Sequence, residues 1–263
     1  MLTRLEANIN KESATAHAII FLHAFPLSAG MWQLQIEALR SAGYPAIAPN
    51  SFGIEGSPEK EGWSFTDYAH ELAGLLDALK IQQVTVVGLS MGGYQAFELY
   101  RLYPEKIASL VLCDTRAEAD TPAARSNRQE FILAVENNGA PEAAARMIPN
   151  YFASTTYTER AELVAQVEAI INKQSAAVIN DAMRAIMMRR DALPSLVSVN
   201  CPVLVLNGEE DKLTTKETAA GIHASIPGST IRILAGAGHI SNIEQPEAFN
   251  RALLEHIKEV RRT

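Results

Sequence analysis

Short runs of apolar residues recur along the chain, and each is too short to form a helix. They occupy residues 18–22, 46–48, 84–87, 107–113, 203–206 and 231–234. Continuous apolar runs of this length, rich in Val, Ile and Leu, are typical of buried strands. Between them, apolar residues return every three or four positions, as on one face of a helix. This alternation predicts an α/β fold with a mostly parallel central sheet that is flanked by helices.

The clearest helix is predicted at residues 65–79, where seven apolar residues recur with a helical period. Ser64 precedes this segment and is a suitable N-cap, because its hydroxyl can accept a hydrogen bond from a free N–H group of the first turn. Further helices are predicted around residues 31–39, at 94–103, and after Pro246 near the end of the chain.

One long stretch interrupts the alternation. No convincing strand is visible from about residue 115 to residue 199, where Ala, Glu, Arg, Met and Gln predominate. Thr121 followed by Pro122 is typical of a helix start. Because this helical stretch is inserted directly after the strand at 107–113, we expect it to form a cap over the sheet. The predicted organisation is an α/β core, residues 1–114 and 200–263, and a helical cap, residues 115–199.

The composition narrows the class of protein without identifying it. Of the 263 residues, 48% are hydrophobic, and 23 basic against 30 acidic residues give a net charge of −7. An acidic chain without clustered Lys and Arg is a poor candidate for binding nucleic acid. No apolar stretch approaches 18 residues and no secretory signal is visible, so we expect a cytoplasmic protein without membrane contact. Cys113 and Cys201 are then expected to be reduced thiols rather than a disulfide.

The sequence Gly88-Leu89-Ser90-Met91-Gly92 directly follows one predicted strand. The pattern G-x-S-x-G alone is weak, but a sharp strand-to-helix turn requires small residues two positions before and two positions after its central residue. Ser90 would then lie at the apex of the turn with its hydroxyl exposed at the end of the sheet. We interpret Ser90 as a candidate nucleophile. The alternative is a glycine-rich turn with an incidental serine.

A serine hydroxyl needs a neighbouring base to act as a nucleophile at neutral pH. His239 follows the last predicted strand in a short loop where no pattern requires an imidazole, and it is the preferred base. Asp211, after the preceding strand, is the preferred carboxylate to orient that imidazole. Asp114 is the alternative, because it too follows a predicted strand. Surface positions are expected for four other histidines: His17, His70, His223 and His256.

The chain order Ser90, Asp211, His239 is the order found in α/β-hydrolases. On these residues the sequence resembles the α/β-hydrolase superfamily over nearly its whole length. Within that superfamily it is similar to small bacterial carboxylesterases and to 3-oxoadipate enol-lactonase-like hydrolases. The resemblance implies the α/β-hydrolase fold. It also implies a Ser-His-Asp triad that cleaves small carboxylic esters through an acyl-enzyme.

The segment His23-Ala24-Phe25-Pro26 occupies the position of the family's oxyanion loop. The resemblance implies that the backbone N–H groups of Phe25 and Met91 stabilise the oxyanion. Ala24 replaces the usual glycine of that loop. Because alanine tolerates a narrower range of backbone angles than glycine, the replacement restricts the conformations of the loop. His23 is expected to shape the loop by packing and hydrogen bonding. The alternative is that His23 lines the substrate pocket.

Several functions are compatible with the same triad. A lactonase, a C–C bond hydrolase or a cofactor-free perhydrolase is the alternative to an esterase, and a small-molecule receptor on the same fold is a lesser one. The expected partner is a small-molecule ester or lactone, with no nucleic acid and no membrane, and the protein is expected to be a monomer or a homodimer. No cofactor and no metal are expected, because no motif that binds either is visible.

Substrate choice is expected to depend on the cap. Met147, Met183 and Met187 form an adaptable apolar set that is a candidate for lining the substrate pocket. The alternative is that they only pack helix against helix. A group of arginines is a candidate for attracting a carboxylate-bearing lactone, with solvation at the cap surface as the alternative: Arg184, Arg189 and Arg190.

Overall fold

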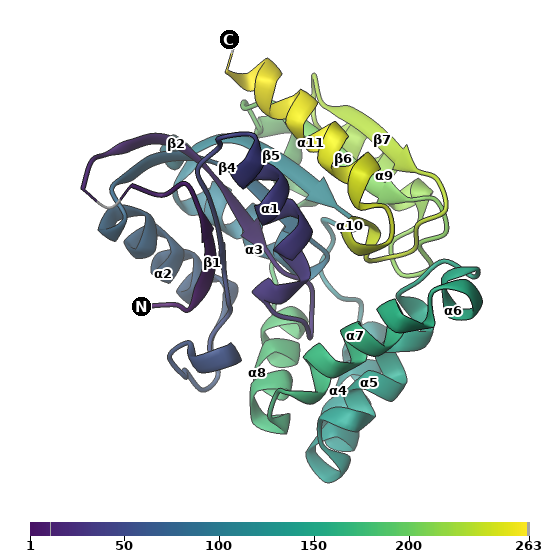
Figure 1. Cartoon of the computed structure of the whole chain (residues 1–263). Helices are drawn as coiled ribbons and strands as arrows, with labels where there is room; N and C mark the ends of the chain where they lie inside the picture. The colour runs from purple at the N-terminus through teal and green to yellow at the C-terminus, as the bar shows by residue number, and fades with distance from the viewer. Residues whose placement is uncertain (11, 262–263) are drawn as a thin grey trace.

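The structure, a computed structural model, describes residues 1–10 and 12–261 (Figure 1). Within these residues, seven strands form one sheet in the order β1-β3-β2-β4-β5-β6-β7. The strands are β1 (Arg4–Ala7), β2 (Thr15–Leu22), β3 (Ala46–Pro49), β4 (Ile81–Leu89), β5 (Ile107–Cys113), β6 (Val203–Gly208) and β7 (Thr230–Leu234). Only β1 runs antiparallel to its neighbour, so the sheet is mostly parallel, as predicted.

Helices flank this sheet. They are η1 (Ala29–Trp32), α1 (Gln33–Ser41), η2 (Ile54–Gly56), α2 (Phe65–Ala78), α3 (Met91–Leu102), η3 (Pro104–Lys106), α9 (Lys216–Ser225), α10 (Ser241–Glu244) and α11 (Pro246–Val260). Helix α1 packs against α11, and α2 packs against α3. The central strands β4, β5 and β6 are almost entirely buried, as their apolar sequences predict.

A second group of helices lies between β5 and β6 in the sequence. It consists of α4 (Pro122–Asn138), α5 (Ala140–Met147), η4 (Ile148–Asn150), α6 (Thr156–Glu159), α7 (Ala161–Asn172), α8 (Ala176–Met187) and η5 (Leu193–Ser198). Figure 1 shows α4, α5, α7 and α8 gathered below the sheet, apart from the helices that flank it. All of these helices fall within residues 115–199, the stretch that we propose to be a cap.

The helix ends follow from local hydrogen bonding. Ser64 accepts a hydrogen bond from the N–H of Asp67, while the Asp67 carboxylate accepts one from the N–H of Ser64. This reciprocal pair is a capping box, so the predicted N-cap of α2 is confirmed. Thr121 caps α4 in the same way by accepting from the N–H of Ala124. Helix α4 ends at Gly139, whose φ of 77° is one that glycine tolerates best.

The sequence pattern missed or misplaced some elements. Strand β1 was not predicted, because a half-buried edge strand of four residues leaves no apolar run. Strand β4 begins at Ile81, three residues before the apolar run, since its polar start still pairs with β2. Helix α3 begins at Met91 rather than at 94, because two glycines with low helix propensity hide its first turn.

Two further expectations concern single features of the chain. Cys113 and Cys201 are free thiols, as predicted, and burial raises the pKa of both, that of Cys201 to about 11. In the part of the chain that the structure describes, no helix combines the length and the apolar character needed to cross a bilayer.

Candidate active site

Ser90 occupies the single position between β4 and α3. Its backbone has φ 55° and ψ −112°, a left-handed conformation that is costly for a residue with a side chain. Two hydrogen bonds hold it there: the N–H of Ser90 donates to the carbonyl of Cys113 at 2.9 Å, and the Thr115 hydroxyl donates to the carbonyl of Ser90 at 2.8 Å. The turn is therefore fastened to the neighbouring strand β5, and the side chain at its apex stays partly exposed.

The glycines of the motif are required by close backbone contacts. A Cβ atom on Gly88 would lie 2.3 Å from the carbonyl oxygen of Gly92, and one on Gly92 would lie 2.0 Å from the carbonyl oxygen of Leu22. Neither backbone oxygen can move without displacing the sheet or the helix. The G-x-S-x-G pattern therefore reflects a turn that brings α3 directly against β2 and β4.

The side chains of Ser90, His239 and Asp211 form one chain of hydrogen bonds. The Nε2 atom of His239 lies 2.8 Å from the Ser90 hydroxyl oxygen, and the Nδ1 atom of His239 lies 2.9 Å from Oδ2 of Asp211. His239 and Asp211 are buried, so water does not separate them. The structure thus brings together three side chains that are up to 149 positions apart in the sequence.

Asp211 is held rigidly by its own loop. The N–H groups of Leu213 and Thr214 donate to its Oδ1 atom at 2.8 and 3.0 Å, and the Thr214 hydroxyl donates to Oδ2. Burial by itself would raise the pKa of Asp211, but the His239 imidazole and these hydrogen bonds outweigh it and lower the pKa below its usual value. Asp211 is therefore a charged carboxylate that can orient an imidazole and stabilise its protonated form.

Asp114 has a different environment and makes no hydrogen bond with His239. Its carboxyl group accepts hydrogen bonds from the N–H of Gly208 at 2.7 Å and from the Ser241 hydroxyl at 2.5 Å. Complete burial and the nearby charge of Asp211 raise the pKa of Asp114 well above its usual value. Asp114 thus links β5, β6 and α10 as a structural group, and the geometry favours Asp211 as the carboxylate beside His239.

The two residues expected to form the oxyanion site are Phe25, in the loop after β2, and Met91, the first residue of α3. The N–H groups of Phe25 and Met91 donate no hydrogen bond to any protein group in the described residues. Ala24, which stands where the family has glycine, is not among the residues with a positive φ, so its side chain adds no backbone strain. Both amides thus remain available to an oxygen atom outside the protein.

His23 supports this loop from within the core. Its Nδ1 atom lies 2.9 Å from the carbonyl of Ala24, and its Nε2 atom accepts a hydrogen bond from the N–H of Ser51 at 3.0 Å. This pattern requires a neutral ring, and complete burial lowers the pKa of His23 to about 4. His23 is therefore a loop-shaping residue and does not line the pocket.

Tyr151 joins the oxyanion loop to the histidine loop, and sequence reasoning missed it. Its hydroxyl donates a hydrogen bond to the carbonyl of Phe25, and its own carbonyl accepts from the N–H of His239 at 2.8 Å. The Tyr151 ring also stacks on the His239 imidazole, with ring centres 5.9 Å apart and planes 24° apart. Nothing in the local sequence marks this tyrosine, because all three contacts depend on how the helical segment meets the core.

Glu244 belongs to a segment that resembles the family's histidine loop, but the sequence alone did not reveal its contacts. Its buried carboxylate accepts hydrogen bonds from the N–H groups of Gly238 and Ala153, at 2.5 and 2.8 Å, and from the Thr156 hydroxyl at 2.7 Å. Burial raises the pKa of Glu244. One carboxylate therefore fastens the loop before His239 to the helical segment that carries Tyr151.

A cavity of about 160 Å³ lies beside Ser90 and His239. Its apolar walls include Phe25, Met147, Ile186 and Leu213, and its charged walls are Arg116, Asp120 and Arg128. Met147 thus lies in the wall of this cavity. Met183 and Met187 are not among its lining residues: Met183 is buried between helices with its sulfur 3.3 Å from Nη1 of Arg128, and Met187 faces a different hollow beside α4.

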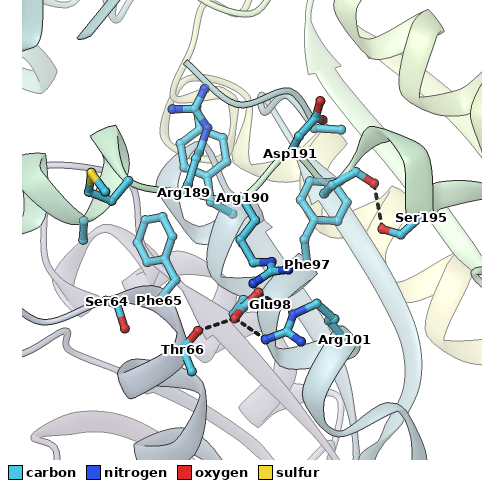
Figure 2. A pocket seen from close by; sticks show the side chains of 15 residues that line it. Ser64, Phe65, Thr66, Phe97, Glu98, Arg101, Arg189, Arg190, Asp191 and Ser195 are labelled. Carbon is cyan, nitrogen blue, oxygen red and sulfur yellow. Dashed lines mark hydrogen bonds and ion pairs between the residues drawn. The ribbon is translucent and has the colours of Figure 1, made fainter. Parts of the chain in front are cut away.

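A second cavity of about 90 Å³ lies on the other side of Tyr94, which lines both (Figure 2). Figure 2 shows Arg190 reaching toward the ion pair of Glu98 and Arg101, whereas Arg189 points away from it. Arg189 was expected at the surface but is buried, because it stacks over the Tyr94 ring at 4.5 Å and pairs with Asp120 at 2.6 Å. Tyr94 thus lines both cavities, and Arg189, which stacks on its ring, lines the second.

The remaining histidines are not all at the surface. His256 is buried on the inner face of α11, and burial lowers its pKa to about 4. His17 is half-buried in β2, where its Nε2 atom lies 2.9 Å from the Thr85 hydroxyl. Neither lies beside Ser90, so these corrections leave His239 as the imidazole next to that serine.

Comparison with known proteins gives the family. The family model described as alpha/beta hydrolase fold matches residues 17–246, which is most of the chain. The chain belongs to the α/β-hydrolase family. This membership agrees with the resemblance seen in the sequence and with the mostly parallel sheet.

Known relatives of this α/β-hydrolase are named for different activities. A 3-oxoadipate enol-lactonase of Acinetobacter baylyi is 29% identical over 237 residues, which cover 90% of this chain and 86% of that protein. The structure of a thermophilic esterase from Thermogutta terrifontis is 30% identical, with a TM-score of 0.92, and the match covers 98% of this chain and 93% of that one. A bromoperoxidase from Bacillus anthracis shares the fold at a TM-score of 0.81 and 24% identity, over 97% and 100% of the two chains.

Proposed function

We propose that this α/β-hydrolase cleaves small carboxylic esters with Ser90 as nucleophile, His239 as general base and Asp211 as the orienting carboxylate. The observation that carries the proposal is the hydrogen-bonded chain from the Ser90 hydroxyl through both ring nitrogens of His239 to Asp211. Such a chain can remove the hydroxyl proton as the oxygen attacks, which a serine alone cannot achieve at neutral pH.

The proposed reaction has two halves. His239 takes the proton of Ser90 while the serine oxygen attacks the ester carbonyl, and the imidazolium then gives that proton to the departing alcohol. Water, activated by the same imidazole, hydrolyses the acyl-enzyme and restores the serine. The free N–H groups of Phe25 and Met91 are the proposed donors to the oxyanion, and one such donor is typically worth about 3–4 kcal/mol of barrier.

Lactone opening is the second candidate, because a lactone is a cyclic ester and the same steps open it. The observation that favours it is the 29% identity with the enol-lactonase of Acinetobacter baylyi. Esterase and lactonase differ only in whether the alcohol stays attached to the acyl group. A substrate panel of short p-nitrophenyl esters and small enol-lactones, assayed side by side, separates them.

The test of the nucleophile is covalent labelling. A serine-directed organophosphonate should modify the peptide that contains Ser90, and the label should be lost in Ser90→Ala and strongly slowed in His239→Ala. Ester turnover should fall about 10⁴-fold or more in either variant. Ser195→Ala, an exposed serine beside the second cavity, is the matched control and should label and turn over like the wild type. Equal turnover by wild type and Ser90→Ala would remove the proposal.

A further inference from the structure

The cavity beside Ser90 carries more positive than negative charge. Arg116 and Arg128 line it from the segment after β5 and from α4, and Asp120 is the one acidic group among its lining residues. Asp120 is already engaged twice, by Nε of Arg128 at 2.5 Å and by Nη1 of Arg189 at 2.6 Å. The Asp120 carboxylate is thus shared by Arg128 and Arg189, and neither of these contacts involves Arg116.

Arg116 is the arginine whose charge is left over. Its Nη2 atom donates a hydrogen bond to the carbonyl of Leu213, a neutral acceptor, and no carboxylate pairs with it in the described residues. Asp211, the carboxylate beside His239, is engaged by His239 and Thr214. Arg116 is half-buried and lines the wall of the cavity.

We propose that Arg116, assisted by Arg128, binds a free carboxylate of the substrate, so that the enzyme prefers esters and lactones that carry such a group close to the scissile bond. The inference rests on the proposed function and adds the substrate class. A guanidinium matches a carboxylate with two parallel hydrogen bonds, and charge-assisted bonds of this kind are roughly twice as strong as neutral ones.

The rest of the cavity sharpens this selection. The side chains of Phe25, Met147 and Ile186 are apolar, so Arg116 and Arg128 are the cationic groups that line this cavity, apart from the uncharged N–H groups assigned to the oxyanion. A neutral substrate of the same shape gains nothing from Arg116. The arginines first considered from the sequence are not placed for this role: Arg184 pairs with Asp181 at the surface, Arg189 is held by Asp120, and Arg190 lines the second cavity.

The experiment compares matched anionic and neutral esters. Monoethyl succinate and ethyl levulinate have nearly the same shape, but the first carries a carboxylate where the second carries a methyl ketone. In 3-acetoxypropionate and 4-acetoxy-2-butanone the same pair of groups lies on the alcohol side. We expect kcat/KM to favour the anion at least about tenfold in one of the two pairs. In Arg116→Gln that preference should fall about tenfold, mainly through KM, while the neutral ester changes less than about threefold.

Two further variants separate charge from packing. Arg116→Lys keeps the charge and should retain part of the preference. Arg125→Gln removes an exposed arginine from the outer face of the same helix that carries Arg128 and should change nothing. No preference for the anion in the wild type, or an equal loss for both esters in Arg116→Gln, would overturn the inference.

A readout that does not need turnover keeps the two proposals distinguishable. Succinate should slow organophosphonate labelling of Ser90 in the wild type, and it should not do so in Arg116→Gln. If Ser90 labels but succinate protects neither protein, the carboxylate site is wrong while the nucleophile stands. If Ser90 does not label at all and no ester is cleaved, the proposed function itself fails.

Discussion

The cavity beside Ser90 is built from two regions that differ in how they are specified. On one side, Ser90, Asp211 and His239 come from turns that directly follow strands β4, β6 and β7. On the other side, Arg128, Met147 and Ile186 come from helices inserted between β5 and β6. Strand ends converge wherever a parallel sheet forms, so the backbone of the sheet already brings the first set to one edge. The second set depends on how helices pack, which many sequences can satisfy in different ways.

The largest effect should come from the sheet side. Asp211→Asn keeps the shape of the side chain but removes the charge and presents an amide that can hold the His239 ring in the wrong tautomer. We expect kcat to fall about 10⁴-fold while the protein remains folded. Steady-state kinetics with a p-nitrophenyl ester measure this directly.

The matched control for that variant is Glu209→Gln, an exposed carboxylate two positions earlier in the same loop. It should keep wild-type kcat within about twofold, since it removes only a solvated charge. A kcat for Asp211→Asn within tenfold of wild type would show that another carboxylate supports His239.

A smaller effect is expected where the helical side reaches across to the sheet side. Tyr151→Phe removes the hydroxyl that donates to the Phe25 carbonyl but leaves the ring stacked on His239. The oxyanion loop then loses this hydrogen bond to the helical segment, while Gln174 still donates to the carbonyls of Pro26 and Leu27. Because a buried hydrogen bond is worth about 1–2 kcal/mol, kcat should fall about tenfold while KM changes little.

Tyr157→Phe serves as the control for Tyr151→Phe. Its hydroxyl donates to the carbonyl of Ile148 at 2.6 Å and lies in the same helical segment, without touching the oxyanion loop. It should lower the melting temperature without changing kcat. If both variants lose stability and neither loses kcat, the contact between Tyr151 and Phe25 is structural only.

The same contrast explains what could be predicted from the sequence. The strands were visible because buried parallel strands require continuous apolar runs. The turn at Ser90 was visible because a Cβ atom at Gly88 or Gly92 would lie only 2.0 to 2.3 Å from a backbone oxygen, so both positions require glycine. Ser90, Asp211 and His239 were selected because each follows a strand. Strand β1 was missed because an edge strand needs no such run.

The helical side could not be predicted in the same way. Met183 and Met147 are chemically identical, yet one is buried among helices and the other lines the cavity, and periodicity does not distinguish them. Tyr151 and Glu244 act through contacts with loops about 90 or more positions away. The sequence assigned no role to Arg116, because its lack of a carboxylate partner is apparent only when the ion pairs of Asp120 are known.

The smallest effect on turnover should come from Asp114, the carboxylate on the sheet side that does not face His239. Since its pKa is raised well above the usual value, its uncharged form resembles an amide, and Asp114→Asn should change kcat less than about threefold at neutral pH. Its effect should instead be on how stability depends on pH. The unfolded chain releases the Asp114 proton above about pH 4, while the folded protein retains it, so folding becomes less favourable as the pH rises toward the folded pKa.

Urea unfolding of wild type and Asp114→Asn between pH 5 and pH 8 tests this. The wild type should lose stability relative to the variant by up to about 1.4 kcal/mol per pH unit until the folded pKa is passed, because Asn has no proton to retain.

Asp211→Asn should change the pH dependence of stability in the opposite direction. The lowered pKa of Asp211 contributes stability that is fully present above about pH 4 and is lost only as the pH falls through the folded value, so that variant should differ in slope from wild type only in acid. If the difference in the free energy of unfolding between wild type and Asp114→Asn is constant from pH 5 to pH 8, Asp114 is charged in the folded protein. Two charged carboxylates, Asp114 and Asp211, would then be buried close to His239.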